Sequence, residues 1–464
     1  MLVGGGSVSL TALLSKRVRS AILDPGADLL FIRPSDESYS RFRQVFNKRI
    51  TLEPSVIAVC KTEAGVQSAV QYAKAKGLPI AVKSGGHSFE GFSLNQGGLV
   101  IDLSQMNDLK VDDRQQMIAG PGSRLADVYE YLLPKGRLIP AGSCGGVGLA
   151  GLTLGGGYGM FTRKYGLTCD SLLRVRMVDG LGAVYDSNDR PDLLWACRGG
   201  GNGNFGVVTK MEFATHPAPD RFDSFRLLFR NLTPKRASAL ASQWFEITPA
   251  LPPEAFSAWV LNGKTLTILV TSFIGGSTDR LQKDVFAGLA AQADTAFPLI
   301  SDKTVSSVKR YYGLNGPVNF KNVSAGFYHG FDDFKPVAEE LFKKVAEAPG
   351  MIFQVNTFGQ IPASAVTASN SAFPHRDFSY IGELQCYWNF SQQEQQSVEA
   401  VGTLRKLLGQ CGVRAHYANY PDIGLEDWKT AYYGERNYAR LQSIKAIYDP
   451  ENRIRHPQSV RLPG

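Results

Sequence analysis

The sequence predicts an α+β protein made of two parts. Up to about residue 218, short β-branched runs alternate with amphipathic stretches among many glycines. Beyond that point, longer strand patterns are separated by amphipathic helical patterns, which is typical of an antiparallel sheet with helices on one face. The chain has 464 residues, 44% of them hydrophobic and 20% charged, so it is long enough to bury a core in each part.

In the first part, short strands are predicted over residues 56–60, 78–82, 99–103, 116–120, 173–179 and 206–214. A helix is predicted over 63–76, because Val66, Val70 and Ala73 recur at helical spacing. A second helix is predicted over 124–133, with Ser123 as its N-cap.

The composition changes near Pro217 and Pro219, where the second part begins. Its strands are predicted over 225–229, 265–271, 353–358 and 381–388, and its helices over 280–293, 334–348 and 392–408. A last helix over 437–447 is stopped by Asp449-Pro450, because the residue before a proline is disfavoured in a helix.

Charge and cysteine content exclude several classes of function. The net charge is +8, but the basic residues are scattered, so no nucleic-acid surface is predicted. None of the six cysteines forms a C-x-x-C pair, so neither a metal site nor a dithiol site is indicated. The small apolar stretch over residues 2–14 is too short to span a bilayer, and we expect no membrane span.

That opening stretch is interpreted as a docked or frayed terminus, with the remnant of a trimmed export leader as the alternative. The compartment stays open between secreted or periplasmic and cytoplasmic. A monomer and a small homo-oligomer are equally compatible with the sequence.

Three glycine-rich segments carry the chemical information. The first is Ser84-Gly85-Gly86-His87-Ser88, directly after a predicted strand. The second, over residues 141–159, has nine glycines in nineteen residues but is neither a P-loop nor a Rossmann turn. The third lies over 198–206. Glycines let backbone N–H groups approach a flat or anionic ligand closely, although Gly-Gly-His alone also fits a tight turn with an incidental histidine.

These segments, in this order and spacing, resemble the FAD-binding domain of the vanillyl-alcohol-oxidase superfamily, a PCMH-type fold. The tail from Tyr448 to Asn452, ending in Gln458-Ser459-Val460, resembles the berberine-bridge-like branch. The likeness runs from about Tyr39 to the end of the chain. It implies that the protein binds FAD through the following residues: Ser84, Gly85, Gly86, His87, Ser88, Gly142, Cys144, Val147, Gly148, Gly151, Gly156, Gly157, Tyr158, Gly159, Gly203, Asn204, Gly206, Val208 and Asn419.

The resemblance also implies that FAD is attached covalently. In this branch a histidine at the position of His87 bonds the flavin 8α-methyl group, and a cysteine at the position of Cys144 bonds C6. An imidazole and a thiolate are both able to add to an electron-poor ring. For Cys144 the alternative is a buried inert thiol. Leu152 stands where many relatives have a histidine, which removes one support of the flavin ribityl chain.

Val147 matches a position that, in this family, controls the access of oxygen to the flavin. A valine there is associated with oxidases, and leucine or isoleucine with dehydrogenases. Ordinary packing is the alternative, since valine is common in protein cores. The residue favours an oxidase that releases hydrogen peroxide.

The substrate side of the site is predicted from Tyr417-Ala418-Asn419-Tyr420-Pro421-Asp422, which resembles the family segment whose second tyrosine is the catalytic base. The resemblance gives that role to Tyr420. Because a free tyrosine has a pKa near 10, its pKa must be lowered for it to act as a base at neutral pH, and a nearby flavin and a cation would lower it. A packed aromatic ring is the alternative for a lone tyrosine.

Two predicted strands complete the substrate site. Gln354 and Asn356 share one strand face, as do Glu383, Gln385 and Tyr387 on the later strand. Gln354, Asn356 and Gln385 resemble the residues around the sugar hydroxyl in oligosaccharide oxidases, although Asn356 replaces an aspartate and Phe89 a tyrosine. An amide cannot accept a proton, so Asn356 is expected only to orient the substrate or Tyr420.

The sequence therefore predicts a flavin oxidase that passes hydride from a hydroxyl-bearing carbon of a carbohydrate or alcohol to FAD, with O2 as the acceptor. We expect an N-terminal segment over residues 1–38, an FAD-binding domain over 39–218, a substrate domain over 219–415 and a returning C-terminal segment over 416–464. One alternative is an oxidase of polyketides, alkaloids or aromatic alcohols, which Phe89 and Asn356 favour slightly. Another is a flavin-binding protein without catalysis.

Overall fold

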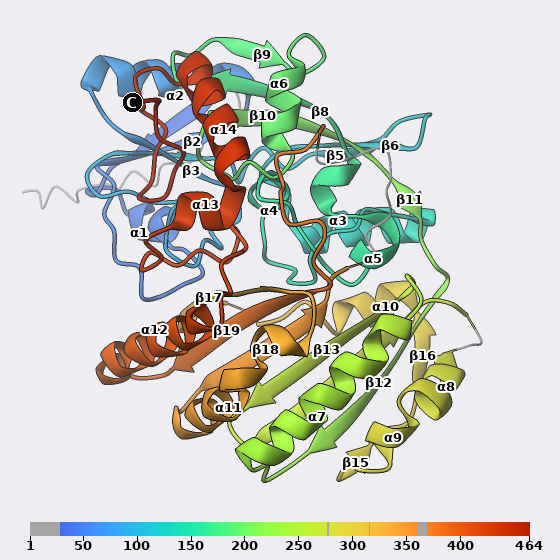
Figure 1. Ribbon diagram of the computed structural model, residues 1–464. Helices are drawn as coiled ribbons and strands as arrows, with labels where there is room; N and C mark the ends of the chain where they lie inside the picture. Colours follow the sequence, from blue (N-terminus) through green and yellow to red (C-terminus); the bar gives the residue numbers. More distant parts are fainter. Residues whose placement is uncertain (1–27, 276–277, 315, 360–368) are drawn as a thin grey trace, which may run out of the picture.

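The computed structural model describes residues 28–275, 278–314, 316–359 and 369–464 (Figure 1). The predicted opening segment over residues 2–14 lies outside these ranges. Helices and antiparallel sheets are combined as expected, which confirms the α+β fold class.

A four-stranded sheet of order β1-β2-β4-β3 begins the first part. Its strands are β1 (Leu29–Ile32), β2 (Val56–Cys60), β3 (Ile80–Lys83) and β4 (Leu99–Asp102). Helix α2 (Glu63–Lys76) packs on it through Val66, Ala69 and Val70, and both α2 and β2 have the predicted bounds. Thr62 caps α2 by accepting a hydrogen bond from the amide of Gly65 at 3.1 Å.

A second sheet of order β5-β6-β10-β8-β9 lies beside the first. Its strands are β5 (Leu109–Val111), β6 (Gln116–Ala119), β8 (Leu172–Asp179), β9 (Val184–Asp186) and β10 (Gly206–Ala214). The predicted cap of α3 (Leu125–Leu132) is wrong: the N-cap is Arg124, and the Ser123 hydroxyl donates to the Asn107 carbonyl at 3.3 Å. The remaining elements of this region are α1 (Tyr39–Arg43), β7 (Arg137–Leu138), α4 (Leu149–Leu154), α5 (Thr162–Tyr165), α6 (Pro191–Cys197) and β11 (His216–Pro217).

The second part is an antiparallel sheet of order β15-β12-β14-β13-β18-β19-β17, with β16 also paired to β12. Its strands are β12 (Arg221–Phe229), β13 (Ala255–Asn262), β14 (Thr265–Ser272), β15 (Thr295–Ala296), β16 (Ile300–Lys303), β17 (Asn319–Tyr328), β18 (Met351–Thr357) and β19 (Tyr380–Trp388). The sequence did not predict β13 and β17, and β17 forms one edge of the sheet.

Helices α7 (Pro234–Ile247), α11 (Ala338–Glu347) and α12 (Glu394–Gln410) cover one face of this sheet (Figure 1). Trp244 and Phe342 from the helices pack with Trp259 and Phe353 from the strands. The other face contributes Phe256 and Ala258 to the core of the first part. The sheet therefore presents this second face to the glycine-rich loops.

The predicted helix over 280–293 is wrong as a continuous element. The chain forms α8 (Thr278–Arg280), a π-helical turn over Leu281–Val285 and α9 (Ala287–Ala290). Helix α10 (Thr304–Lys309) follows β16.

After the sheet, the chain returns to the first part (Figure 1). Helices α13 (Trp428–Tyr433) and α14 (Glu435–Tyr448) pack there, and Ile454 pairs in parallel with Ile80 of β3. Lys445 and Asp449 form a fully buried ion pair, and the Lys445 ammonium also donates to the Asn204 carbonyl at 2.5 Å. The C-terminal segment thus contacts both the third glycine turn and the first sheet and holds them together.

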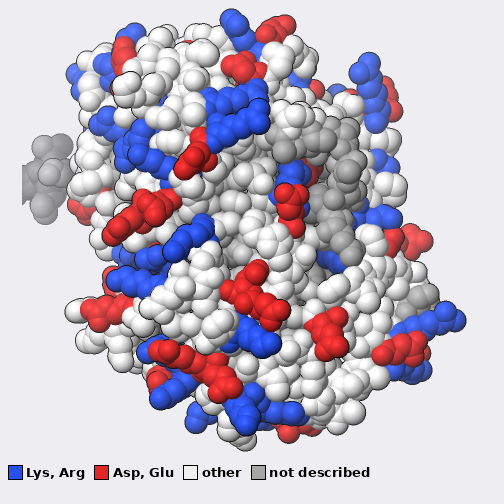
Figure 2. All heavy atoms as spheres, in the orientation of Figure 1, with Lys and Arg blue, Asp and Glu red and all other residues white. Residues whose placement is uncertain are grey.

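The surface carries no large area of one charge on the face drawn in Figure 2, where Lys and Arg alternate with Asp and Glu. Over the described ranges, no helix has both the length and the apolarity needed to cross a bilayer.

Candidate active site

The first two glycine segments lie against each other. A Cβ atom added to Gly85 would stand 2.3 Å from the amide nitrogen of Gly148, so only glycine permits this approach. The Ser84 hydroxyl donates to the Pro121 carbonyl at 2.6 Å, and the Ser88 hydroxyl accepts from the Phe92 amide at 3.0 Å. The turn after β3 and the loop before α4 therefore form one continuous backbone surface.

His87 follows this turn and stacks on Phe46, with the ring centroids 4.1 Å apart. Its Nε2 atom lies beside the second loop, because a Cβ atom on Gly146 would stand 2.8 Å from it. Burial first, and then Arg124, lower the pKa of His87 to about 4. The imidazole is therefore neutral near pH 7 and keeps a lone pair for a bond to an electrophile.

Cys144 lies two residues before Gly146 and is exposed. Its sulfur is near Gly313, where an added Cβ atom would stand 3.2 Å from it. Desolvation of the thiol by the surrounding protein, and to a smaller extent the Glu383 carboxyl, raise the pKa of Cys144 to about 11. The thiol is therefore the main form of Cys144 near pH 7, and it must lose its proton before its sulfur adds to the flavin.

The second half of the glycine loop is held by the C-terminal segment. Asn419 donates to the Leu152 carbonyl at 2.9 Å and to the Tyr417 hydroxyl at 3.0 Å. A Cβ atom on Gly155 would stand 2.0 Å from the Asn419 side-chain oxygen, which excludes any larger residue there. Six glycines of the predicted set lie in this loop, at Gly142, Gly148, Gly151, Gly156, Gly157 and Gly159.

The third glycine turn packs against the C-terminal segment. Asn204 is buried, and its side chain donates to the Gly200 carbonyl at 3.0 Å and accepts from the Val460 amide at 2.9 Å. Gly203 is next to His456, whereas Gly206 begins β10. Val208 is buried inside β10 and packs in the core of the first part, so the structure gives it a packing role.

The predicted substrate residues are joined in one hydrogen-bonded chain. The Gln385 amide donates to Gln354 at 3.3 Å, and the Gln354 amide donates to Asn356 at 2.9 Å. Asn356 then donates to the Tyr158 hydroxyl at 2.8 Å, which also accepts from the Tyr420 hydroxyl at 3.0 Å. The sheet face and the glycine loop therefore meet at Tyr158, which the sequence had assigned only to the flavin.

Tyr420 lies in an aromatic group at this junction. Its ring stacks on Phe89, with centroids 5.3 Å apart and an interplanar angle of 11°. Burial, the Glu383 carboxyl and Tyr158 raise the pKa of Tyr420 well above its ordinary value. Among the described residues, the ionisable side chain with the largest effect on Tyr420 is the Glu383 carboxyl.

Residues 415–423 form a strap along β17, the edge strand. The Ser324 amide donates to the Tyr420 carbonyl at 2.9 Å, and the Phe327 amide donates to the Ala415 carbonyl at 3.0 Å. The strap thus occupies hydrogen-bonding groups that an edge strand would otherwise leave open. It also fixes the position of Tyr420 relative to the sheet.

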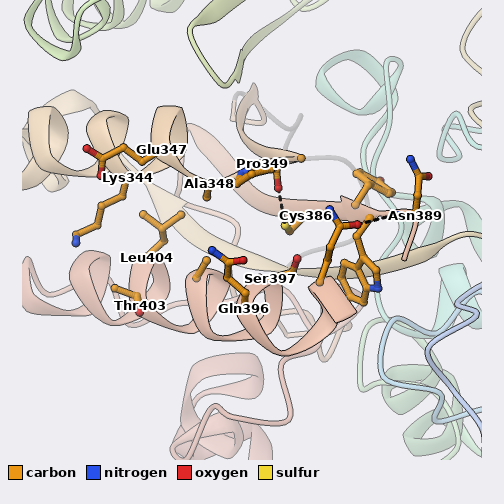
Figure 3. A pocket seen from close by; sticks show the side chains of 15 residues that line it. Lys344, Glu347, Ala348, Pro349, Cys386, Asn389, Gln396, Ser397, Thr403 and Leu404 are labelled. Atoms are coloured by element: carbon orange, nitrogen blue, oxygen red, sulfur yellow. Dashed lines mark hydrogen bonds between the residues drawn. The ribbon is translucent and has the colours of Figure 1, made fainter. Parts of the chain in front are cut away.

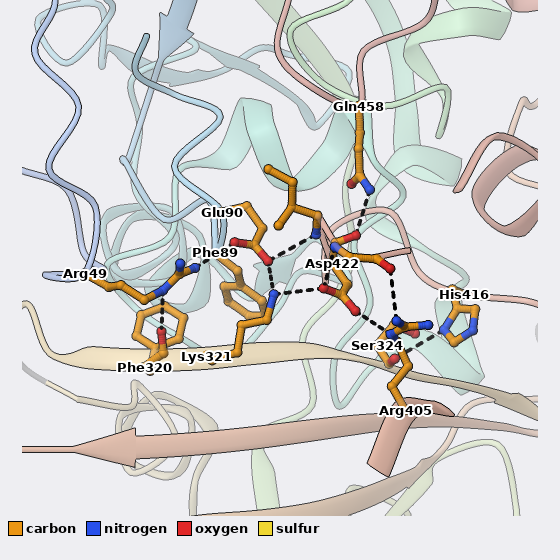
Figure 4. A network of polar contacts seen from close by, with 12 residues as sticks. Arg49, Phe89, Glu90, Phe320, Lys321, Ser324, Arg405, His416, Asp422 and Gln458 are labelled. Carbon is orange, nitrogen blue, oxygen red and sulfur yellow. Dashed lines mark hydrogen bonds and ion pairs between the residues drawn. The ribbon is translucent and has the colours of Figure 1, made fainter. Parts of the chain in front are cut away.

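A network of alternating charges anchors the end of this strap (Figure 4). Glu90 pairs with Arg49 at 2.6 Å and with Lys321 of β17. Asp422 pairs with Lys321 at 2.8 Å and with Arg405 of α12 at 2.5 Å. Although burial alone would raise it, the pKa of Asp422 is lowered by Lys321 and Arg405.

Two residues of this site were missed from the sequence. Glu383 was placed on the correct strand face but received no role. Asn322, whose amide donates to the Tyr387 hydroxyl at 3.0 Å, lies on β17, which was not predicted. The alternation of Asn322 and Ser324 along the strand was one weak signal for β17.

A separate cavity of about 450 Å³ lies on the helix face of the sheet (Figure 3). It is lined by the ends of α11 and α12 and by Cys386 and Trp388, which alternate with Gln385 along β19. Because successive side chains of a strand point to opposite faces, this cavity is separated from Tyr420 by the sheet itself.

The residues present fit a flavin. Open space surrounds Gly151, where an added Cβ atom would have no neighbour within 4 Å. The neutral imidazole of His87 and the exposed thiol of Cys144 stand on two turns that touch through Gly85 and Gly148. Val147, between Cys144 and α4, is partly buried against the core of the first part.

Comparison with known proteins gives an independent indication. Residues 54–188 match the model of an FAD binding domain, and residues 416–461 match the model described as berberine and berberine like. An uncharacterised FAD-linked oxidoreductase of Bacillus subtilis is 31% identical over 452 residues, which cover 92% of this chain and 95% of that protein. A chitooligosaccharide oxidase of Gibberella zeae is 30% identical over 468 residues, with 92% and 91% covered.

Solved structures agree with these matches. The berberine-bridge-like protein 1 of Physcomitrella patens has a TM-score of 0.85 at 25% identity, with 94% of this chain and 97% of that chain covered. A glucooligosaccharide oxidase of Acremonium strictum, described with a 6-S-cysteinyl, 8α-N1-histidyl FAD, has the same fold with a TM-score of 0.83 at 24% identity, covering 94% and 97%.

Proposed function

Since the chain belongs to the berberine-bridge-like family of FAD-linked oxidoreductases, we propose that it oxidises a hydroxyl-bearing carbon, with a carbohydrate hemiacetal as its donor and O2 as its acceptor. Its cofactor is FAD. The proposed division places the FAD-binding domain at residues 39–218, the substrate domain at 219–415 and the returning segment at 416–464.

The observation that carries this proposal is the hydrogen-bonded chain from Gln385 through Gln354, Asn356 and Tyr158 to Tyr420. It puts a row of amide groups, which bind hydroxyl groups well, next to a phenol able to exchange a proton. The likeness to a chitooligosaccharide oxidase and to a carbohydrate oxidase of Microdochium nivale, 29% identical over 479 residues, supports a sugar donor.

In the proposed mechanism, Tyr420 accepts the proton of the donor hydroxyl. Gln354 and Gln385 orient the donor, and Asn356 fixes the Tyr158 hydroxyl beside Tyr420. Holding the reacting hydroxyl in one orientation lowers the entropic part of the barrier. FAD, when bound, would supply the two-electron acceptor for the hydride of the carbon, and O2 is the proposed final acceptor, giving hydrogen peroxide.

His87 and Cys144 are proposed as the two attachment points of the flavin. The support is local: both nucleophilic atoms lie on adjoining turns, and the imidazole is neutral near pH 7. Val147 is proposed to admit oxygen to the reduced flavin, since it follows the Cys144 loop and is smaller than leucine.

A second enzymatic function keeps the flavin but replaces the sugar by a polyketide, alkaloid or aromatic alcohol. The stacked rings of Phe89 and Tyr420, together with Asn356 in place of an acid, favour it. A flavin-binding protein without catalysis is the third candidate. It predicts a flavin that dithionite reduces and no organic donor does.

The experiment is a peroxide-release screen of the FAD-loaded protein with chitooligosaccharides, cello-oligosaccharides and aromatic alcohols. We expect peroxide with at least one sugar, and Tyr420→Phe to slow flavin reduction by about 10²–10⁴-fold, the usual contribution of a general base. A fully loaded Tyr420→Phe protein that reduces its flavin at the wild-type rate would contradict the mechanism. Peroxide from aromatic alcohols alone would select the second candidate.

A further inference from the structure

One buried carboxyl group at the junction has no role in the mechanism above. Glu383 lies on β19 and is only 6% exposed. It stands opposite Gln354 of β18 and Ser324 of β17 in the strand register, so it projects among the substrate residues. A carboxyl group is rarely buried unless it is paired or has a function.

The partners of Glu383 are neutral. Gln385 donates to one carboxyl oxygen at 2.9 Å, and Asn322 to the other at 3.5 Å. Tyr420 is held next to the same pair of strands, because its carbonyl accepts from the amide of Ser324, the residue that pairs with Glu383, and its hydroxyl also acts on the carboxyl. These donors hold the carboxyl in place, but none of them carries a positive charge that would keep it ionised.

Glu383 and Tyr420 oppose each other's ionisation. Burial raises the pKa of Glu383 to about 8, in spite of the hydrogen bonds from Gln385, Tyr420 and Asn322. The other titratable groups on which its charge acts are Tyr158 of the glycine loop, Tyr387 of β19 and Cys144. The pair is therefore neutral below about pH 8 and holds one negative charge above it, and its titration belongs to both groups together.

We propose that Glu383 is the final acceptor of the donor's hydroxyl proton, which reaches it through the Tyr420 hydroxyl. The donor O–H bond breaks as its proton bonds to the Tyr420 oxygen. The Tyr420 hydroxyl, which donates to Tyr158 in the resting structure, turns to Glu383, and its O–H bond breaks as its proton bonds to the Glu383 carboxylate. The transfer neither creates nor consumes a proton. The electrons of the donor C–H bond leave in the redox step of the proposed function, and this relay rests on that function.

The relay removes a difficulty of the tyrosine mechanism. Tyr420 is neutral before and after the transfer, so the site never has to stabilise a buried tyrosinate next to a carboxylate. Asn356 is unable to play this part, because an amide does not take up a proton. The carboxyl of the neighbouring strand supplies the group that Asn356 lacks.

The first test needs no organic donor. Infrared difference spectra of the FAD-loaded protein should show a protonated carboxyl band that appears as the pH falls through about 8, the pKa of Glu383. Glu383→Gln should remove the band. Tyr420→Phe should move its midpoint to higher pH, because the Tyr420 hydrogen bond lowers the pKa of Glu383. A wild-type spectrum without this band, or a midpoint unchanged in Tyr420→Phe, overturns the relay.

The second test measures flavin reduction by chitobiose against pH. The wild-type rate should fall as the pH drops, because the relay needs an ionised Glu383. Glu383→Gln should remove this dependence and lower the rate about 10²–10⁴-fold, and Glu383→Asp should recover part of it. Glu254→Gln, in a partly exposed ion pair with Lys164, is the control and should leave spectrum and rate unchanged.

The outcomes separate the two proposals. A slow Tyr420→Phe together with a Glu383→Gln protein that keeps the wild-type pH profile rejects the relay and leaves the tyrosine mechanism standing. A Tyr420→Phe protein that is as fast as the wild type rejects the proposed function itself.

Discussion

At the scale of single residues, the protonation states of His87 and Cys144 differ in a way that their residue types do not reveal. Burial makes His87 a neutral base over the whole physiological range, since its pKa is about 4. Although the Cys144 residue is exposed, desolvation of its thiol by the surrounding protein, with Glu383, makes it a protonated thiol, since its pKa is about 11. The two bonds to the flavin should therefore form with different dependence on pH.

This difference gives a prediction for flavin attachment. Wild-type protein precipitated with acid should stay yellow, and His87→Ala and Cys144→Ala should each keep the flavin through the other bond. When apoprotein is reconstituted with FAD, attachment in His87→Ala should speed up about tenfold per pH unit below pH 11, as the thiolate fraction rises. The rate of attachment in Cys144→Ala should not change between about pH 6 and 9, because His87, with a pKa of about 4, is already neutral over this range.

Absorbance of the acid precipitate measures both reactions. Cys411→Ala, a free cysteine away from the glycine loops, is the matched control and should behave as the wild type. Complete release of FAD from the wild type by acid would reject both attachment points.

At the scale of secondary structure, the pairing of β18 with β19 decides what the substrate face contains. The antiparallel register sets Gln354 opposite Glu383, so the amide of one strand and the carboxyl of the next lie side by side. Asn356 on β18 reaches the Tyr158 hydroxyl, which ties the sheet to the glycine loop. A charge introduced at Asn356 would therefore act on both tyrosines.

The corresponding prediction concerns Asn356→Asp. A second carboxylate should raise the pKa values of Tyr420 and Glu383 further, and near pH 7 each unit of increase for Glu383 should slow flavin reduction by chitobiose about tenfold, because less of it is ionised. Asn356→Ala removes the hydrogen bonds without adding charge, so its loss should be smaller. Stopped-flow measurement of flavin reduction compares the two variants. Faster oxidation of chitobiose by Asn356→Asp would instead indicate that the face works best with an acid on β18.

At the scale of the whole molecule, the charge network of Glu90, Lys321 and Asp422 joins three distant parts of the chain. Glu90 follows Phe89, Lys321 follows Phe320, and Asp422 lies two residues after Tyr420. Phe89 contacts both of those rings, by stacking on Tyr420 and edge-on with Phe320. The network therefore fixes the backbone segments that bring these rings together.

Loss of Lys321 tests this connection. Lys321→Met leaves two buried carboxylates with fewer cations, and breaking such pairs typically costs about 3–5 kcal/mol of stability. Denaturant unfolding of the FAD-loaded protein measures that loss, and flavin reduction should slow as the Tyr420 strap loosens. Lys321→Met with Glu90→Gln should recover part of the stability, because one unpaired charge is removed.

The control for this experiment is Lys164→Met. Its partly exposed pair with Glu254 should contribute only about 0–1 kcal/mol. Equal losses of stability in Lys321→Met and Lys164→Met would contradict a special role for the buried network.

Much of the fold followed from periodicity and glycine spacing. The helix α2 and the strands β2 and β10 were predicted with the observed bounds, because their patterns are local and unbroken. Strand β17 and the interruption after α8 were not, since the long-range pairing of an edge strand and a π-helical turn leave little local signal. The cap of α3 failed because Ser123 found a different hydrogen-bond partner in Asn107.

By itself, the sequence determined the class of the protein and its cofactor and predicted the residues around the flavin, because glycine turns, a histidine and a cysteine at fixed spacing are properties of the chain. Only the tertiary structure decided how those residues interact. Tyr158 became the junction between loop and sheet, and Glu383 became the charged neighbour of Tyr420. Burial and contact with segments distant in the sequence set these protonation states, and neither quantity is encoded in any local pattern.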